Sequence, residues 1–207
     1  MMGENTTLDR ILSVATQEFL KNGFQGASLR GIVKSAGVTT GAFYRYFPTK
    51  EALFDALVKP YADHIRALYC RALDDIQVLP AEQQAEEMTH RSTDCIEEML
   101  DYVYSNYINF KLLLCSSHGT VYEHFLHELV ELEVDSTFRF MKTMELAGHP
   151  MPKLDRDLCH MIASGLMSGI FEMVIHDMCP SEARRRVRQL REFYTGGWER
   201  LFGISFG

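Results

Sequence analysis

Residues 28–50 read SLRGIVKSAGVTTGAFYRYFPTK, and this stretch decides the fold. Ser28 and Thr39 are of the residue types that cap the N-termini of helices, and the turn Ala36-Gly37-Val38 lies between them. The spacing therefore predicts two short helices joined by a glycine-containing turn, which is a helix-turn-helix. The second helix is expected to be anchored by three apolar side chains, those of Val38, Phe43 and Phe47.

The remaining side chains of the second short helix are expected to point outward. They are Thr39, Thr40, Ala42, Tyr44, Arg45 and Tyr46. Hydroxyls, one guanidinium and two phenols at the start of a helix suit a DNA phosphate and a groove edge. The alternative is a helical hairpin with a polar face, because helix-turn-helix pairs also serve as scaffolding.

Outward from this motif, the chain reads as helix in both directions. Apolar residues recur at the helical spacing, and neither a hairpin pair of strands nor a fixed repeat is found. We expect a first helix that ends at Gly23, and Pro60 predicts a kink or a break in the helix that follows the motif. Further helices are expected at about 82–104, 106–115, 120–147, 155–178 and 182–202. The fold class is therefore all-α, with about nine helices.

The charge is divided unevenly along the chain. Residues 1–50 hold six basic and three acidic side chains, whereas the other 157 residues hold 15 basic and 25 acidic ones, within a net charge of −7. Residues 1–50 can therefore lie against a polyanion, whereas the acidic remainder of the chain would repel one. We therefore expect a DNA-binding domain over residues 1–50 and an effector-binding and dimerisation domain over 51–207.

Composition and cysteine usage point to a soluble, cytoplasmic protein. The chain of 207 residues is 46% hydrophobic and 24% charged, which excludes a disordered class. Its five scattered cysteines do not form a disulfide pattern, and its first residues lack the basic and apolar regions of a signal peptide. The longest uncharged stretch, 158–171, is shorter than the roughly 18 residues of a membrane span, so no membrane partner is expected.

The motif resembles the N-terminal domain of the tetracycline-repressor (TetR) family. The resemblance covers about the first 55 residues, and it rests on ATQEFLKNGFQGASLRGIVKSAG followed by the recognition segment GVTTGAFYRYFPTKEALF. The family pattern of Gly-x-hydrophobic-Tyr-x-x-Phe-x-x-Lys is met by Gly41, Phe43, Tyr44, Phe47 and Lys50. The resemblance implies a ligand-responsive transcriptional regulator, more often a repressor, that needs no cofactor and binds a near-palindromic operator as a homodimer.

The resemblance also implies roles for single residues. Tyr44 and Lys50 match positions that contact phosphate, and Ser28 and Thr39 cap helices beside the DNA backbone. Positions that reach bases are matched by Thr40, Ala42, Arg45 and Tyr46, with Arg30 as a further candidate. Many family members carry Lys or Arg where this chain has Thr40, so base readout is expected to lean on Arg45 and on contact of Ala42 with a thymine methyl group.

The resemblance places the dimer interface on the last two helices. The sequence agrees, because small residues at close helical spacing permit close approach of helices, although packing within one subunit explains them too. The expected interface residues are Ser164, Gly165, Ser168, Gly169, Gly196, Gly197 and Trp198. The run of arginines from Arg184 to Arg191 is interpreted as a solvated helix face rather than a second nucleic-acid patch.

The middle helices are rich in aromatic and sulfur side chains, which are core or the lining of an effector pocket. The pocket candidates for a small, largely apolar effector are Met99, Tyr102, Tyr107, Phe110, Phe125, Phe138 and Met141. A rival hypothesis is a metal sensor that uses Cys115, His118, His124 and His127. Catalysis by a Cys115–His118 pair is a third class, but no oxyanion hole or phosphate loop accompanies it, so an enzyme is not expected.

Overall fold

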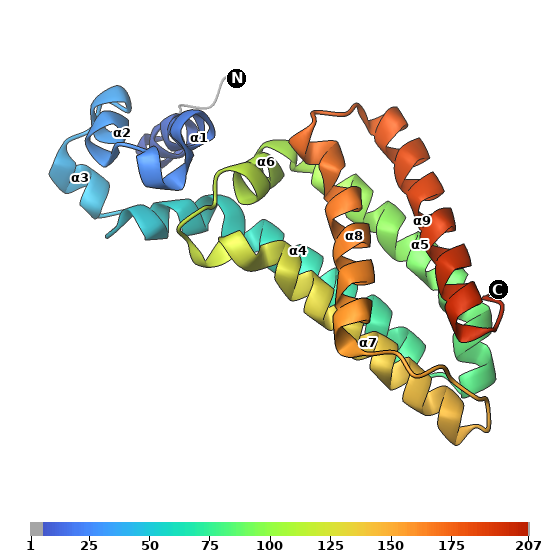
Figure 1. Ribbon diagram of the computed structural model, residues 1–207. Helices are drawn as coiled ribbons and strands as arrows, with labels where there is room; N and C mark the ends of the chain where they lie inside the picture. Colours follow the sequence, from blue (N-terminus) through green and yellow to red (C-terminus); the bar gives the residue numbers. More distant parts are fainter. Residues whose placement is uncertain (1–5, 207) are drawn as a thin grey trace. The chain divides into compact units, whose positions relative to one another are not determined.

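The computed structural model describes residues 6–206 (Figure 1). Over this range the chain is helical and contains no strand, which confirms the all-α prediction. The elements are α1 (Thr7–Gly26), α2 (Leu29–Ser35), α3 (Thr40–Tyr44), α4 (Lys50–Gln77), α5 (Ala81–Ser105), α6 (Tyr107–Cys115), the 3-10 helix η1 (Val121–His124), α7 (Phe125–Leu146), α8 (Arg156–Ile175) and α9 (Pro180–Phe202).

The chain divides into two compact units. The first unit extends to Asp63 and takes in residues 106–125, and the second consists of residues 64–105 and the chain from Leu126 onward. The division in α4 lies after Asp63, whereas the sequence suggested a functional boundary after residue 50. Helix α6 and η1 belong to the first unit, in which α6 lies against α1 and also contacts η1.

Helix α1 is fixed at its start by a reciprocal pair of hydrogen bonds. The Thr6 hydroxyl accepts from the Asp9 backbone N–H at 3.2 Å, and the Asp9 carboxylate accepts from the Thr6 backbone N–H at 3.0 Å. The expected end at Gly23 is a kink instead, since Gly23 has a φ of 67° and helical backbone resumes up to Gly26. A left-handed conformation of this kind is the one that glycine adopts without strain.

The core of the first unit is aromatic. Phe19 and Phe24 of α1 surround Phe54 of α4, with ring centroids 5.1 and 5.3 Å from that of Phe54. All three rings are buried. Rings at these distances in edge-to-face geometry add to the gain from burial by about 0.5–1.5 kcal/mol a pair. The cluster holds α1 and the start of α4 together, and α2 packs against α1.

Pro60 lies inside α4, and the helix continues through it from Lys50 to Gln77. The expected break into two helices does not occur. Proline cannot donate to the Ala56 carbonyl, which is its normal helical acceptor. At the next carbonyl, that of Leu57, the Asn109 side-chain amide of α6 donates a 2.8 Å hydrogen bond. A donor from outside the helix thus binds the backbone where the proline disturbs it.

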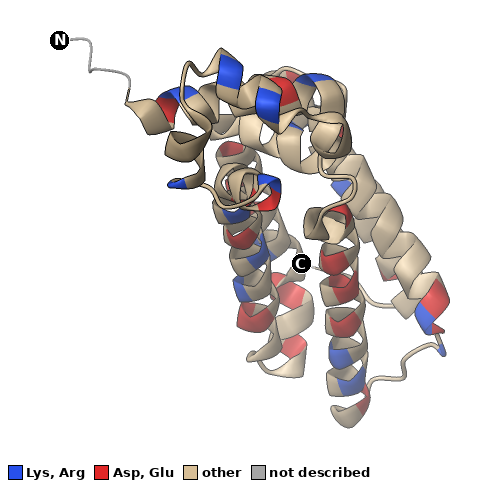
Figure 2. Ribbon diagram, turned by 90° about the vertical axis from the view of Figure 1, so that its left-hand side faces the viewer, with Lys and Arg blue, Asp and Glu red and all other residues tan. Residues whose placement is uncertain are grey.

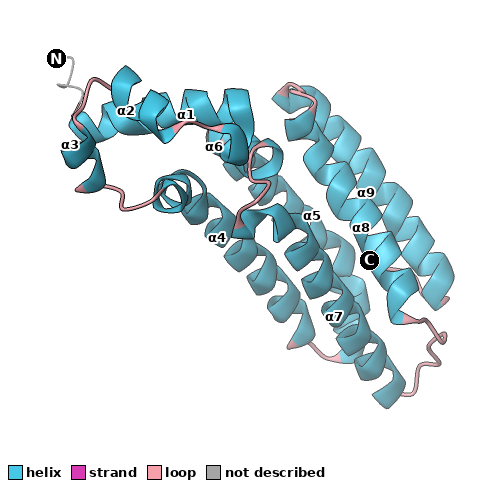
Figure 3. Cartoon of the chain, turned by 60° about the vertical axis from the view of Figure 1, so that its left-hand side comes forward, coloured by secondary structure: helices cyan, strands magenta, loops and turns pink. Residues whose placement is uncertain are grey.

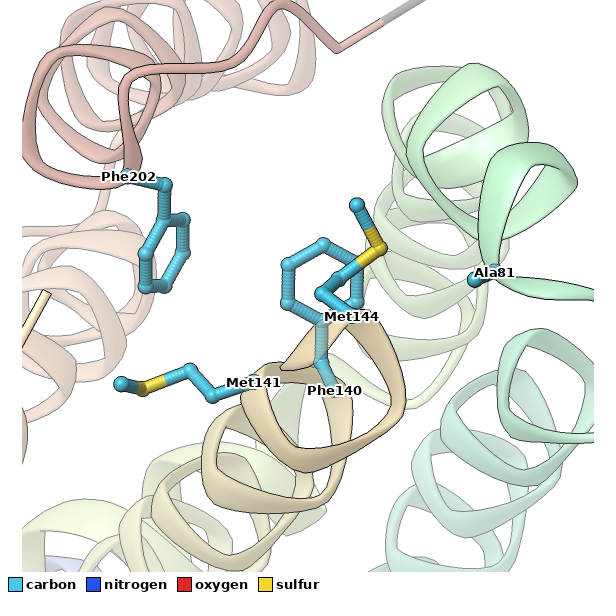
Figure 4. Packing of buried hydrophobic residues seen from close by; sticks show 5 residues of the cluster. All are labelled: Ala81, Phe140, Met141, Met144 and Phe202. Carbon is cyan, nitrogen blue, oxygen red and sulfur yellow. The ribbon is translucent and has the colours of Figure 1, made fainter. Parts of the chain in front are cut away.

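In the second unit α8 lies along α9, and α9 also contacts α5 (Figure 3). One end of this unit is closed by a cluster of buried apolar residues from α5, α7 and α9: Ala81, Phe140, Met141, Met144 and Phe202 (Figure 4). The rings of Phe140 and Phe202 lie 5.7 Å apart. The cluster fixes the ends of the three helices, so that a cavity can persist between them without collapse of the bundle.

By length and composition alone, α8 is apolar enough to cross a membrane. A core helix passes the same test, and 39% of the apolar window of α8 is buried inside the molecule. Its buried side chains include Met167, Ile170 and Phe171. The apolar character of α8 is therefore explained, at least on this face, by packing against the rest of the second unit.

Candidate DNA-binding surface and effector cavity

Helices α2 and α3 form the expected helix-turn-helix. The Ser28 hydroxyl accepts from the Gly31 backbone N–H at 3.1 Å, and the Thr39 hydroxyl accepts from the Ala42 backbone N–H at 3.1 Å. Both predicted caps are thereby confirmed, and each contributes about 1 kcal/mol to its helix. Between the helices, Gly37 takes a φ of 63° that turns the chain. Local interactions thus fix the start of each short helix and the turn between them.

The expected anchors and contact residues separate onto two sides of α3. Phe43 is fully buried and Phe47 is nearly so, whereas Val38 is half-buried. Tyr44 and Tyr46 are 50% and 47% exposed, which is high for aromatic side chains. Also exposed are Ser28, Arg30, Thr39, Thr40 and Arg45, and Ala42 is half-buried. We call these accessible residues of α2, α3 and their caps the recognition surface.

A contact that the sequence did not reveal sets the start of α2. The Glu18 carboxylate of α1 accepts a 2.9 Å hydrogen bond from the backbone N–H of Ser28. This N–H is one of the donors that a helix leaves without an internal partner, and a carboxylate also favours the positive N-terminal end of α2. Glu18 therefore orients the recognition surface on α1, and its negative charge is engaged by the backbone beside that surface.

Lys50 does not lie on the recognition surface as a free cation. Its Nζ donates to the backbone carbonyls of Phe24, Gln25 and Ala27, at 2.8, 3.3 and 3.4 Å, and stands 4.6 Å from the centre of the Phe24 ring. An ammonium has three donors, so all of them are used at the end of α1. In this structure Lys50 therefore has a structural role at the end of α1, and its expected contact with phosphate stays a prediction.

The net charge of the residues around the motif is positive, as expected. Within described residues 6–50, six basic side chains are accompanied by two acidic ones, Asp9 and Glu18. Both acidic groups have backbone partners, at Thr6 and Ser28. The long helices of the second unit carry both acidic and basic segments (Figure 2). The recognition surface is thus the part of the chain whose charge suits a polyanion.

The second unit encloses a cavity of about 140 Å³ between α4, α5, α7, α8 and α9. Its wall is mainly apolar and aromatic, as in most small-molecule sites. Apolar wall residues from each of these helices include Leu73, Ile76, Met88, Ile96, Met99, Phe140, Leu166, Ile170, Trp198 and Phe202. All lining residues belong to the second unit.

A few polar groups interrupt this wall. The Tyr69 hydroxyl donates to the Glu133 carboxyl group, and burial raises the pKa of Glu133 above its ordinary value and that of Tyr69 well above its own. The Gln84 side chain is 1% exposed, and among the described residues its Oε1 has no hydrogen-bond partner; the same holds for the Thr89 hydroxyl. A buried polar atom without a hydrogen-bond partner costs free energy. A ligand whose polar group formed a hydrogen bond with either atom would recover that cost.

The seven expected pocket residues are not brought together. Met99 lines the cavity, whereas Tyr107, Phe110 and Phe125 lie in the first unit. Tyr102 stacks on His64 with ring centroids 3.8 Å apart. Phe138 and Met141 pack in the apolar cluster at the end of the bundle. Residue type selected these side chains correctly as packing residues, but it could not tell which helix faces enclose the cavity.

The small residues of α8 serve packing within the chain. A Cβ atom at Gly165 would clash with the Tyr194 hydroxyl, and one at Gly169 would lie 2.7 Å from Leu190 Cδ2, both on α9. The close approach expected of these glycines is therefore explained inside one subunit. By contrast, Gly196 and Gly197 are accessible and a Cβ at either would meet open space, and Trp198 stacks on Phe202.

Apolar side chains remain exposed on the same two helices. Phe193 of α9 and Met161 of α8 are 74% and 70% exposed, and Leu158 and Leu201 are also exposed. The arginine run of α9 shows the expected ion pairs: Arg184 contacts Glu97 and Asp101, Arg186 contacts Glu182, and Arg188 contacts Glu97. Exposed large apolar residues with a charged border are typical of a protein interface.

The residues of the metal-sensor hypothesis do not form a metal cluster. His118 and His124 both contact Glu123, at 3.1 and 3.3 Å, and Cys115 is exposed. Among described residues, the one group with three possible metal ligands close together is a different set, His127, Glu131 and His160. Of the four expected ligands only His127 belongs to it.

The fold and site define a helical protein with an N-terminal helix-turn-helix domain and a second, cavity-bearing helical unit. Residues 11–57 match the family model of bacterial regulatory proteins, tetR family. This part of the chain is a tetR-family domain, as the sequence predicted.

Over 62 residues the chain is 42% identical to the HTH-type transcriptional regulator UidR of Escherichia coli K12, a match that covers 30% of this chain and 31% of the relative. The chain thus spans about a third of the length of the curated relatives that it matches.

Solved structures extend the likeness to the whole fold. The fatty acid degradation regulator FadR of Bacillus halodurans has a TM-score of 0.56 and 16% identity, with 92% of this chain and 98% of that chain covered. The transcriptional regulator FadR of Bacillus subtilis in complex with stearoyl-CoA gives 0.51 and 16%, with 87% and 96% covered. Identities this low establish the fold alone.

Proposed function

We propose that this protein is a cytoplasmic, homodimeric transcriptional regulator that binds operator DNA through the recognition surface and is released from it by a small molecule. The observation that supports this most is the exposure of Tyr44, Arg45 and Tyr46 on a helix whose opposite side is locked by buried Phe43 and Phe47. A structural hairpin gains nothing from exposed aromatic side chains, whereas a DNA groove uses them.

Different residues of the recognition surface contact the phosphates and the bases. The Tyr44 hydroxyl contacts phosphate, and the helix caps Ser28 and Thr39 lie beside the DNA backbone. Arg45 reads a base by donating two hydrogen bonds, for which guanine is the preferred partner. The partly buried Ala42 provides apolar contact with a thymine methyl group.

Homodimerisation uses the exposed faces of α8 and α9. Phe193 and Met161 supply the apolar centre of the interface, and Gly196 and Gly197 allow a second backbone to approach. Two recognition surfaces in one dimer must enter major grooves about 34–36 Å apart, which requires a near-palindromic operator. A single short helix buries too little surface for tight and specific binding.

The effector occupies the cavity of the second unit. The apolar wall accepts the body of a largely apolar molecule, and Gln84 Oε1 and the Thr89 hydroxyl receive its polar group. The FadR structure with stearoyl-CoA is of a protein that shares this fold and binds a ligand with a long apolar chain. For nearly complete release, the effector must favour the non-binding dimer state by about 5 kcal/mol. Repression is the favoured mode, because release by a ligand then induces transcription.

Selection of DNA from a random pool tests the proposal. Wild type should enrich one near-palindromic sequence, whereas the Arg45→Ala/Tyr46→Ala variant should enrich none. Lys142→Ala, which removes an exposed basic residue from α7, serves as the matched control and should enrich the same sequence as wild type. Compounds that release the selected DNA are then screened, and their action should be lost on Thr89→Val. A pool that yields no shared sequence with wild type would contradict the proposed function.

A further inference from the structure

Three side chains with metal-binding atoms meet between α7 and α8, on the outside of the second unit. His127 and Glu131 are one turn apart on α7, and His160 comes from the second turn of α8. One donor atom of each lies within 4.8 Å of the other two. The cluster does not line the cavity and has no part in the recognition surface.

Two of the three distances between the donor atoms match a metal centre, and the third is within 4.8 Å. His160 Nε2 lies 3.3 Å from His127 Nδ1 and 3.4 Å from Glu131 Oε1. In a tetrahedral zinc site with metal–ligand bonds of about 2.0–2.1 Å, neighbouring ligand atoms stand roughly 3.3–3.4 Å apart. An ion placed among the three atoms would therefore need little movement of the side chains.

The groups behind the ligands are arranged as a metal site requires. The Ser164 hydroxyl, one turn along α8, lies 3.3 Å from His160 Nδ1. As an acceptor there it holds the proton on Nδ1 and leaves Nε2 free to bind a cation. The other oxygen of the Glu131 carboxylate, Oε2, accepts from Arg156 at 2.6 Å, so Oε1 is oriented toward His160.

From this arrangement we infer that His127, Glu131 and His160 bind one zinc-class divalent transition-metal ion that joins α7 to α8. Two imidazoles and a carboxylate suit Zn²⁺, Co²⁺ or Ni²⁺ rather than Mg²⁺, which prefers oxygen ligands. Water completes the coordination, because His127 is exposed and Glu131 and His160 are half-buried. The ion holds the α7–α8 pair together and is independent of DNA binding.

Metal titration of the full-length chain, free of a histidine tag and first treated with chelator, tests the inference. Wild type should bind one Zn²⁺ per chain and should not bind Mg²⁺ at the same concentration. His160→Ala and Glu131→Gln should each weaken Zn²⁺ affinity at least tenfold, and Ser164→Ala about tenfold through its effect on the tautomer. The matched control is His176→Ala, which removes a histidine that pairs with Glu172 at 2.6 Å in a two-residue contact.

Two further measurements separate this site from other modes of binding. Co²⁺ bound at the site should show visible bands without the thiolate charge-transfer band that a cysteine site gives. Zn²⁺ should raise the melting temperature of wild type and of His176→Ala but not of His160→Ala, because only the folded chain presents the three ligands. Equal Zn²⁺ binding by wild type and His160→Ala, or a thiolate band, would overturn the inference. If the variants differ in stability only when chelator is present, the cluster is a hydrogen-bonded network and the inference is wrong.

Discussion

The Nζ atom of Lys50 lies 2.8 Å from the carbonyl oxygen of Phe24, so that the first residue of α4 closes the last turn of α1. The end of a helix carries partial negative charge on its free carbonyls, and a cation placed there stabilises it. The lysine that the family pattern contains at this position therefore stabilises the end of α1.

Lys50→Ala should lower the free energy of unfolding by about 1.5–3 kcal/mol, because hydrogen bonds from a charged ammonium to three backbone carbonyls are lost. Lys59→Ala, on the same helix, removes an exposed pair with Asp63 and should cost less than about 1 kcal/mol. Urea titration compares the two. If Lys50→Ala kept its stability and instead reduced the salt dependence of DNA binding by about one unit in the slope of log K against log salt, the phosphate role would be correct.

Arg45→Ala should weaken binding to operator DNA by about 1–3 kcal/mol and leave binding to random DNA nearly unchanged, since it removes a base contact. Tyr44→Phe should weaken both kinds of binding alike, since it removes a phosphate contact. Fluorescence anisotropy at matched salt concentrations distinguishes the two patterns. The same loss on both DNAs for Arg45→Ala would place its guanidinium on the DNA backbone.

Phe193→Glu should shift the protein toward monomer, because it places a charge on the most exposed apolar residue of α9. Gly165→Leu should instead destabilise each subunit, typically by about 1–3 kcal/mol, since its side chain would displace Tyr194. Light scattering over a range of concentrations and urea titration give the two results. A dimer that survives Phe193→Glu would move the interface to another face.

Glu133 makes stability depend on pH. Burial raises the pKa of its carboxyl group above the ordinary 4.5, so between these two values the folded chain holds a proton that the unfolded chain has lost. The contribution of this group to stability is full below pH 4.5 and is lost as the pH rises through the raised pKa. Each tenfold difference between its acid dissociation constants in the folded and unfolded chain corresponds to about 1.4 kcal/mol. Glu133→Gln should remove this decline, whereas Glu145→Gln at an exposed site of α7 should not.

Urea titration across the pH range measures this dependence. Equal pH profiles for wild type and Glu133→Gln would exclude Glu133 as the source of the decline.

Pro60→Ala should raise the free energy of unfolding by up to about 3 kcal/mol, because the Ala56 carbonyl regains its helical donor. We also expect it to reduce the effect of effector on DNA affinity, since α4 contributes to both compact units. Operator affinity with and without effector, for both proteins, gives this ratio. An unchanged ratio would show that the proline has no part in the response.

The parts of the molecule that the sequence predicted are those fixed by local interactions. Ser28 and Thr39 cap their helices because each hydroxyl reaches the backbone N–H three residues further along the chain. A few consecutive residues are enough to predict such a contact. The cavity could not be found in this way, because it depends on which faces of five helices meet. One signal was present: Thr89, Ser92, Cys95, Ile96 and Met99 recur at helical spacing on a single face of α5, and all of them line the cavity.

Lys50 shows that a residue can be identified from the sequence while its partner cannot. Its sequence position marked it as important, but a long flexible cation reaches either a phosphate or a carbonyl, and only the distance to the end of α1 decides between them. The same applies to Gly165, whose lack of a side chain predicts a close neighbour without saying whether that neighbour is Tyr194 of its own chain or another subunit.

Every residue of the cavity wall lies outside the first compact unit, so a substitution in the wall leaves the residues of the recognition surface unchanged. Under the proposed function, exchange of wall residues such as Met88 or Ile96 would change which effector the protein accepts without altering the operator that it binds.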